Sequence, residues 1–350
     1  MTIQFVILLA LTIGTTFFVT VVSIGLVIHK GVTARSRVVK DRLYSRYSGM
    51  IAEVLLGPLP EDMPAGPSGA RLRAYDTLCA PVAAQLKWKI GRARELHRAA
   101  LRLGILNFAQ DVTGESLDRL THLSYYLGFV DEEIRRLGHR HWWIRSQAAR
   151  DLGLMRARKA TSLLMERLDD PHPDVRNQAR ESLVVIVGVE SLREILKRSR
   201  NLTRWSEIEL SVIVMRFKES AVPYLVEALA FADQSVVLFC VEMLAEIGFV
   251  TAVEPLLALA TRYPNVRVRS RAMEALGRLG DERAEKLLRS NVTNPNPILR
   301  LSALRALGFI GSPSAVPSLL DRFERGELQE KILAGGALVK AGTRGKDMLL

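Results

Sequence analysis

The chain has 350 residues and a formal net charge of +12, and hydrophobic residues make up 48% of it. Aromatic residues account for only 6%, which favours a mostly helical protein over a β-sandwich or barrel. Its two cysteines, Cys79 and Cys240, exclude a disulfide framework and a four-thiolate zinc site, and we expect both to be ordinary core thiols.

The N-terminal segment is strongly apolar, because no charged residue occurs between Met1 and Ile28. A helix of about 20 apolar residues can cross a bilayer, and basic residues beside a span favour the cytoplasmic side. We therefore predict a transmembrane anchor over residues 1–29 that contacts lipid, in a single-pass protein of the bacterial inner (cytoplasmic) membrane with its N-terminus outside. Six basic residues just after the span are candidates for contact with acidic lipid headgroups at the membrane surface: Lys30, Arg35, Arg37, Lys40, Arg42 and Arg46.

Three further segments precede the main part of the chain. Residues 30–56 combine these basic side chains with apolar residues at steps of three and four, which predicts a juxtamembrane helix that either continues the anchor or lies on the membrane. Residues 57–70 are rich in proline and glycine and are predicted to be a linker. Residues 71–138 carry a helical pattern without the repeat found later, which predicts an atypical helical N-terminal cap.

An internal repeat of about 31 residues fills the chain from residue 139 to residue 350. The reference positions of the repeat are 145, 176, 207, 237, 269, 300 and 331. Five of them are basic and stand next to an apolar residue. A small residue stands three positions later in most copies, and a second apolar run opens fourteen or fifteen positions later, so each repeat is predicted to hold two helices. Gly280 and Gly311 are expected to end first helices in the left-handed conformation.

With its VR..A...LG and AVP.LL signatures, the repeat resembles the HEAT-repeat family, in particular the short bacterial type of phycobilisome-lyase-like proteins. The resemblance implies an all-α fold in which a single transmembrane helix is followed by a right-handed α-α superhelical solenoid of about seven repeats. It also implies an extended concave surface for partner proteins. HEAT-like deoxyhypusine hydroxylases bind iron through His-Glu pairs, but this chain has no histidine followed by glutamate.

Chemistry-bearing motifs are missing from the sequence: it has no phosphate-binding loop, dinucleotide fingerprint, nucleophile elbow or zincin helix. His139 and His141 form an H-x-H pair next to arginine, which favours a turn between repeats over a metal site. The arginines at the reference positions are predicted to be structural surface pairs of small energetic value. Residues 201–250 carry seven acidic and three basic side chains, which interrupts any continuous track for nucleic acid. We therefore expect no enzyme, no cofactor, no bound metal and no nucleic-acid partner.

Protein binding is the function that remains. The interface candidates are Trp142, Trp143 and Trp205, with Phe231 and Phe239, and the apolar C-terminal end that includes Leu349 and Leu350. We predict a membrane-anchored cytoplasmic scaffold, an accessory subunit that positions a partner such as a glycosyltransferase of exported polysaccharide synthesis. The alternative is a signalling adaptor that captures a soluble regulator, and a second copy of the chain is a further partner compatible with the fold.

Overall fold

The computed structural model describes residues 41–58, 69–87 and 89–341, together with Gly14, Phe18–Thr20, Val22 and Ser23. Every regular element in this part of the chain is a helix, as predicted. The chain divides into two compact units. The first unit comprises Met1–Arg136 with Leu154–Ala157, and the second comprises Leu137–Gly153 with Arg158–Leu350.

The predicted single-pass inner-membrane localisation is corrected by the structure. None of the helices that the structure describes is both long enough and apolar enough to cross a bilayer. The physical reason is that these helices are amphipathic, with apolar residues packed inside each unit and charged residues on the opposite face. The predicted span, residues 1–29, lies almost entirely outside the described residues, as do Lys30, Arg35, Arg37 and Lys40.

The first unit contains a helix over residues 41–56 and four further helices: α2 (Gly69–Lys87), α3 (Gly91–Asp111), α4 (Gly114–Tyr126) and α5 (Phe129–Leu137). The helix over residues 41–56 buries Tyr47, Ile51 and Val54. The Tyr47 hydroxyl lies 2.6 Å from His97 Nδ1 on α3. Arg119 on α4 donates hydrogen bonds to the carbonyl oxygens of residues 54, 55 and 57, which end this helix. The apolar face that suggested contact with a membrane therefore packs against protein.

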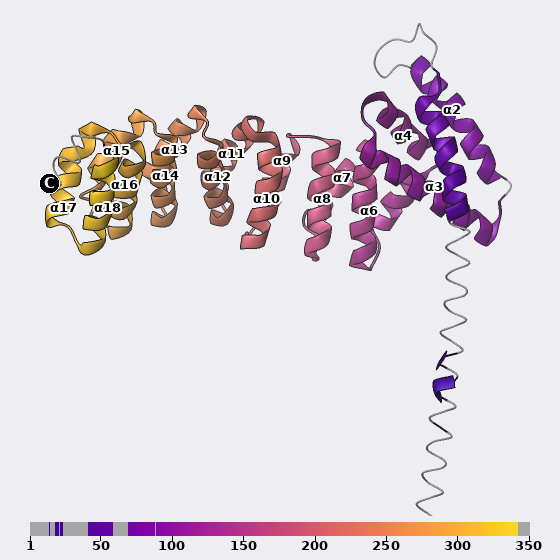
Figure 1. Ribbon diagram of the computed structural model, residues 1–350, viewed down its shortest axis with the longest axis horizontal. Helices are drawn as coiled ribbons and strands as arrows, with labels where there is room; N and C mark the ends of the chain where they lie inside the picture. Colours follow the sequence, from indigo (N-terminus) through magenta and orange to yellow (C-terminus); the bar gives the residue numbers. More distant parts are fainter. Residues whose placement is uncertain are drawn as a thin grey trace, which may run out of the picture. The chain divides into compact units, whose positions relative to one another are not determined.

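The second unit alternates longer first helices with shorter second helices (Figure 1). We call the first helices the first-helix row: α6 (Trp142–Leu154), α8 (Pro173–Ile186), α10 (Arg204–Phe217), α12 (Gln234–Ile247), α14 (Val266–Leu279), α16 (Pro297–Ile310) and α18 (Leu328–Lys340). We call the second helices the second-helix row: α7 (Thr161–Arg167), α9 (Ser191–Arg198), α11 (Val222–Ala228), α13 (Val253–Arg262), α15 (Glu285–Asn291) and α17 (Val316–Arg325). Each reference position falls in the first turn of a first helix, so the repeat frame read from the sequence is the frame of the structure.

Small residues let successive first helices approach closely. The alanines three positions after the reference positions are fully buried in five first helices: Ala148, Ala179, Ala272, Ala303 and Ala334. At Gly277 on α14, an added Cβ atom would lie only 2.5 Å from the Cα atom of Ala306 on α16. The two backbones are thus nearly in contact at this point.

The first helices end in a repeated way. Gly248, Gly280 and Gly311 end α12, α14 and α16 with φ angles of 75°, 69° and 65°, which confirms the left-handed ends predicted for the last two. In α10 the corresponding residue is Lys218, which also has a positive φ of 48°. This repeat therefore departs from the pattern at its end as well as at its reference position.

Three of the reference arginines hold the turns between repeats. Arg145, Arg176 and Arg300 each donate from Nη1 to the two carbonyl oxygens five and six residues earlier, at 2.8–3.0 Å. Arg300 Nε also donates to Glu330 Oε1 at 2.7 Å, and the Glu330 side chain is buried. The prediction of weak surface pairs was wrong for the Arg300–Glu330 and Arg145–Asp170 pairs, because both carboxylates are removed from solvent.

Asp170 connects two neighbouring repeats. Its buried carboxylate accepts hydrogen bonds from Arg145 Nε and Nη2, at 2.8 and 2.7 Å, and from the backbone N–H of His172. Burial alone would raise the pKa of Asp170, but these hydrogen bonds and the positive charges of Arg145 and Arg167 outweigh it and lower the pKa. The carboxylate is therefore charged in the folded state and stabilises it.

We expect Gly277→Ala to lower the free energy of unfolding by about 2 kcal/mol, because the added methyl group overlaps the backbone of α16. Gly336→Ala on α18 is the matched control, since its Cβ would meet no atom within 4 Å and alanine favours a helix. Urea unfolding followed by circular dichroism measures both. Equal effects of the two substitutions would contradict the close approach.

We expect Asp170→Asn to cost about 2 kcal/mol at neutral pH, because it leaves the Arg145 guanidinium without its buried carboxylate. Since the pKa of Asp170 is lowered in the folded state, its contribution is complete above the ordinary value of 3.8 and is lost as the pH falls through the folded-state pKa. The difference from wild type should therefore narrow in urea titrations below about pH 4. Asp169→Asn, in the same turn, removes an exposed pair with Arg198 and should cost no more than about 1 kcal/mol.

Candidate functional site

Exposed large apolar side chains of the second unit gather on the first-helix row. They are Trp142 and Trp143 on α6, Val185 on α8, Trp205, Ile208 and Val212 on α10, Ile298 and Phe309 on α16, and Leu328, Ile332 and Val339 on α18. Within the described residues, the second-helix row exposes only Phe323 in this class, and the turn after α12 exposes Phe249 and Val250. These side chains form two groups, on α6–α10 and on α16–α18, with none on α12 or α14. Exposed apolar patches mark interaction surfaces in soluble domains, so the first-helix row is the candidate binding face.

The second-helix row carries exposed ion pairs between neighbouring repeats. Arg193 on α9 lies 2.9 Å from Glu227 on α11, and Arg283 lies 3.1 Å from Glu254 on α13. Such exposed pairs add little stability, but they keep this face polar and hydrated. The first-helix row carries such pairs as well, among them Arg216–Glu181, Arg278–Glu242 and Arg305–Glu274, so the two rows differ in their exposed apolar side chains and not in ion pairing.

An exposed indole on α10 is held in one orientation. Trp205 has 68% of its surface exposed, yet its Nε1 donates to Glu209 Oε1 at 2.6 Å. The same oxygen accepts from Asn177 Nδ2 on α8 at 2.5 Å. Buried Arg180 donates to Asn177 Oδ1 and lies 3.9 Å from Glu209 Oε2; burial lowers the pKa of Arg180, and the charge of Glu209 opposes that shift. A fixed, exposed tryptophan loses little side-chain entropy when it is buried by a partner.

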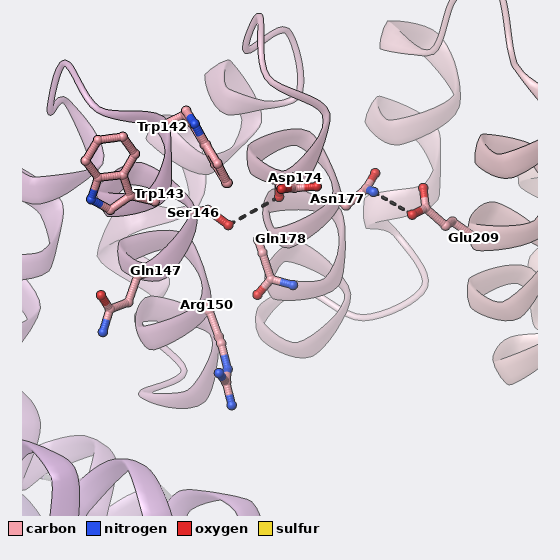
Figure 2. Close-up of a pocket in the computed structure, with 9 residues that line it drawn as sticks. All are labelled: Trp142, Trp143, Ser146, Gln147, Arg150, Asp174, Asn177, Gln178 and Glu209. Carbon is pink, nitrogen blue, oxygen red and sulfur yellow. Dashed lines mark hydrogen bonds between the residues drawn. The ribbon is translucent and has the colours of Figure 1, made fainter.

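A shallow groove of about 660 Å³ crosses α6, α8 and α10 (Figure 2). Amide, hydroxyl and charged side chains line it together with two indoles: Trp142, Trp143, Ser146, Gln147, Arg150, Asp174, Asn177, Gln178 and Glu209. Both indoles are partly exposed, and each stacks on a histidine ring. Trp142 stacks on His172 with 3.7 Å between ring centroids, and Trp143 stacks on His141 with 4.3 Å.

A second groove, of about 450 Å³, lies between α10, α12 and α14. We call it the α12 groove. It is lined by Arg204, Glu207, Ile208, Ser211, Leu238, Phe239, Glu242, Met243, Glu246, Arg267 and Arg271. The sequence reasoning missed Ile208, Val212, Leu238 and Met243. The signal that could have found them is the loss of the reference arginine at positions 207 and 237.

The histidine pair and the two cysteines lie in surroundings that give them structural parts. His139 Nδ1 accepts the backbone N–H of His141, and the described residues contain no group of three or more potential metal ligands. Burial raises the pKa of Cys79 to about 12, and it also raises the pKa of Cys240, so both thiols stay protonated. Neither cysteine is thus suited to nucleophilic chemistry.

The other predicted site residues are dispersed. Arg42 and Arg46 lie exposed on the helix over residues 41–56, where Arg46 donates to Gln85 Oε1. Phe239 is buried at the floor of the α12 groove, and Phe231 is half-buried in the turn before α12. Leu349 and Leu350 lie outside the described residues.

Residues 130–211 and 253–337 match the family model for HEAT repeats. These segments are HEAT repeats. The stretch between the two HEAT segments includes all of α12. No curated protein matches the chain.

Solved structures with similar folds share few residues with these HEAT repeats. Human deoxyhypusine hydroxylase is 18% identical, with 77% of this chain and 96% of that chain covered and a TM-score of 0.31. The CpcE–CpcF complex of phycocyanin lyase from Nostoc sp. is 19% identical, with coverages of 83% and 97% and a TM-score of 0.28. Kap121p is 10% identical, with coverages of 88% and 38% and a TM-score of 0.44.

We expect Glu209→Ala to destabilise the second unit by about 2 kcal/mol, because it removes the carboxylate beside buried Arg180. It should also free the Trp205 indole, seen as lower fluorescence anisotropy in a variant that keeps only this tryptophan. Glu207→Ala on the same helix removes only a pair with exposed Arg204 and is the control. An unchanged anisotropy in Glu209→Ala would show that the network does not hold the indole.

Proposed function

We propose that the chain is a non-catalytic scaffold whose first-helix row binds and positions a partner protein. The carrying observation is the gathering of exposed apolar side chains on that row, whereas the second-helix row, among the described residues, exposes only Phe323 in this class. HEAT solenoids present such extended faces to partners, and their repeats contact only their neighbours along the stack.

The tryptophans support α6 to α10 as the centre of the interface. Binding energy concentrates in a few aromatic and arginine anchors, and fixed anchors need little ordering on association. Trp205 is fixed by Glu209, and Trp142 and Trp143 are stacked on histidines. These three side chains therefore have the chemistry of interface anchors.

The narrower predictions differ in the partner. Nothing in the HEAT segments or in the polar lining of the grooves supports a glycosyltransferase of polysaccharide synthesis as the partner. An adaptor for a soluble regulator would use the same face, and nothing observed favours that partner either. A scaffold for a protein partner is the level that the observations support.

The test is affinity purification of the tagged chain from its native cells with quantitative mass spectrometry. We expect a partner at near-stoichiometric amounts, and a loss of at least about tenfold in the Trp143→Ala/Trp205→Ala double variant, as for interface anchors worth more than about 1.4 kcal/mol. Tyr224→Ala, on the second-helix row, is the matched control and should leave recovery unchanged. Equal recovery with all three proteins would refute the assignment of the face.

A further inference from the structure

We propose that α18 binds the α18 helix of a second copy of the chain, with the two helices packed antiparallel across a two-fold axis. The contact uses the open face of α18, which consists of Leu328, Ile332, Gly336 and Val339 at the end of the first-helix row (Figure 1). This inference goes beyond the proposed function, because it concerns self-association and places it away from the tryptophans of α6 and α10.

Successive first helices pack through two recurring positions, one and eight residues after the reference position. One residue after it, Ser270 of α14 is buried and shares a hydrogen bond of 2.7 Å with Ser302 of α16. Eight residues after it, Gly277 of α14 approaches Ala306 of α16, and Gly308 of α16 approaches α18 in the same way. In these helices both positions are thus covered by the first helix of the following repeat.

In α18 the same two positions are exposed and apolar. They are Ile332 and Val339, and Leu328, one turn before Ile332, is exposed as well. No helix follows α18 in the part of the chain that the structure describes. The surface that joins neighbouring repeats therefore continues on α18 without a helix packed on it. Repeat stacks keep an open face soluble with polar residues, and this face lacks them, which marks it as an association site.

The glycine in the open face favours a close approach by another backbone. Five of the other six first helices carry a charged residue at the position of Gly336: Arg150, Glu181, Glu242, Glu274 and Arg305. A glycine inside a helix destabilises it relative to alanine, and an added Cβ atom at Gly336 would meet no atom within 4 Å. No contact within the described residues requires this glycine, whereas a helix packed closely on the open face does.

The open face is complementary to itself, which is why we assign it to a second copy. Ile332 lies four residues before Gly336, and Val339 lies three residues after it. When two such helices pack antiparallel and cross at their glycines, Ile332 of each copy faces Val339 of the other. A two-fold contact uses the same patch of both copies and closes on itself, so association stops at a dimer.

Two charged residues of α18 are engaged on its other sides. The Lys340 ammonium lies over the ring of Phe309 on α16, 5.2 Å from the ring centroid. The Glu330 carboxylate is buried and accepts a hydrogen bond from Arg300. The dimer contact would therefore bury apolar groups without removing either charge from its present partner, which avoids the cost of desolvating a charge.

Sedimentation velocity of the purified 350-residue chain over a range of concentrations tests the proposal. We expect a reversible monomer–dimer equilibrium, with weak affinity because one helix pair makes a small interface. Ile332→Lys places a charge in the contact and should raise the dissociation constant at least about tenfold. Val212→Lys on α10 is the matched control, because Val212 is exposed to a similar extent, 57% against 64% for Ile332, and lies in the other apolar group.

The Ile332→Lys/Val339→Glu double variant tests the antiparallel pairing. Across the two-fold axis the introduced lysine of each copy faces the introduced glutamate of the other, so the double variant should dimerise more tightly than Ile332→Lys alone. A parallel or unspecific contact would instead be weakened further by the second charge.

Three results would overturn the proposal. The first is a chain that stays monomeric at every concentration, as expected if residues 342–350 cover the open face instead. The second is equal association of Ile332→Lys and Val212→Lys, and the third is no recovery in the double variant. The Trp143→Ala/Trp205→Ala variant should dimerise as the wild type does, so the dimer and the proposed partner-binding face can fail separately.

Discussion

The contact between successive first helices is the constraint on which the second unit depends. Where Gly277 meets Ala306, the backbones of α14 and α16 approach within the space of a missing methyl group. Such contacts fix both the distance and the register of neighbouring repeats. Residues at matching frame positions then become neighbours about 31 residues apart, which is why Glu274 reaches Arg305, while Glu242 reaches Arg278 one helical turn further along. On the outward surface of the row, residues at the same frame position in successive first helices therefore lie side by side.

The fold of the second unit could be predicted because its information is local and repeated. A helix start, a small residue at the contact and a glycine at the end recur with the same spacing, and each copy supports the interpretation of the others. Contacts between distant residues of the first unit left no such signal. Arg119 ends a helix by reaching carbonyl groups 62–65 residues earlier, and no spacing in the sequence indicates this pairing.

The prediction of a helix over residues 30–56 left open what covers its apolar face, for a related physical reason. An amphipathic pattern shows that one face of a helix avoids water, but it does not show whether protein or lipid covers that face. Tyr47 illustrates the ambiguity, because an aromatic ring with a polar tip suits a membrane interface as well as a buried contact with His97. The surface site was predictable only in part. The sequence suggests that the tryptophans are exposed, but the bond from Trp205 to Glu209 and the buried Arg180 behind it depend on the packing of α8 against α10.

The departure of α10 and α12 from the repeat becomes intelligible once the role of the reference arginine is known. Arg145, Arg176 and Arg300 hold the turns before their helices, and a repeat without the arginine needs another way to hold its turn. Before α12, Asp233 does so by accepting the backbone N–H groups of Asn201, Ser235 and Val236. Burial alone would raise the pKa of Asp233, but these hydrogen bonds lower it and keep the carboxylate charged.

Asn265 and Asn296 cap α14 and α16 in the same way although those repeats keep their arginines, so the bond from Asn201 to Asp233 is what distinguishes the turn before α12. Val237 takes that position in α12 and is fully buried, so the helix gains core contacts there instead of a hydrogen-bonded guanidinium. Because each repeat contacts only its neighbours, such a local exchange leaves the stacking of the other repeats intact. The stretch that falls outside the HEAT match therefore coincides with a repeat whose turn is tied by a carboxylate to the preceding turn and whose reference position belongs to the core.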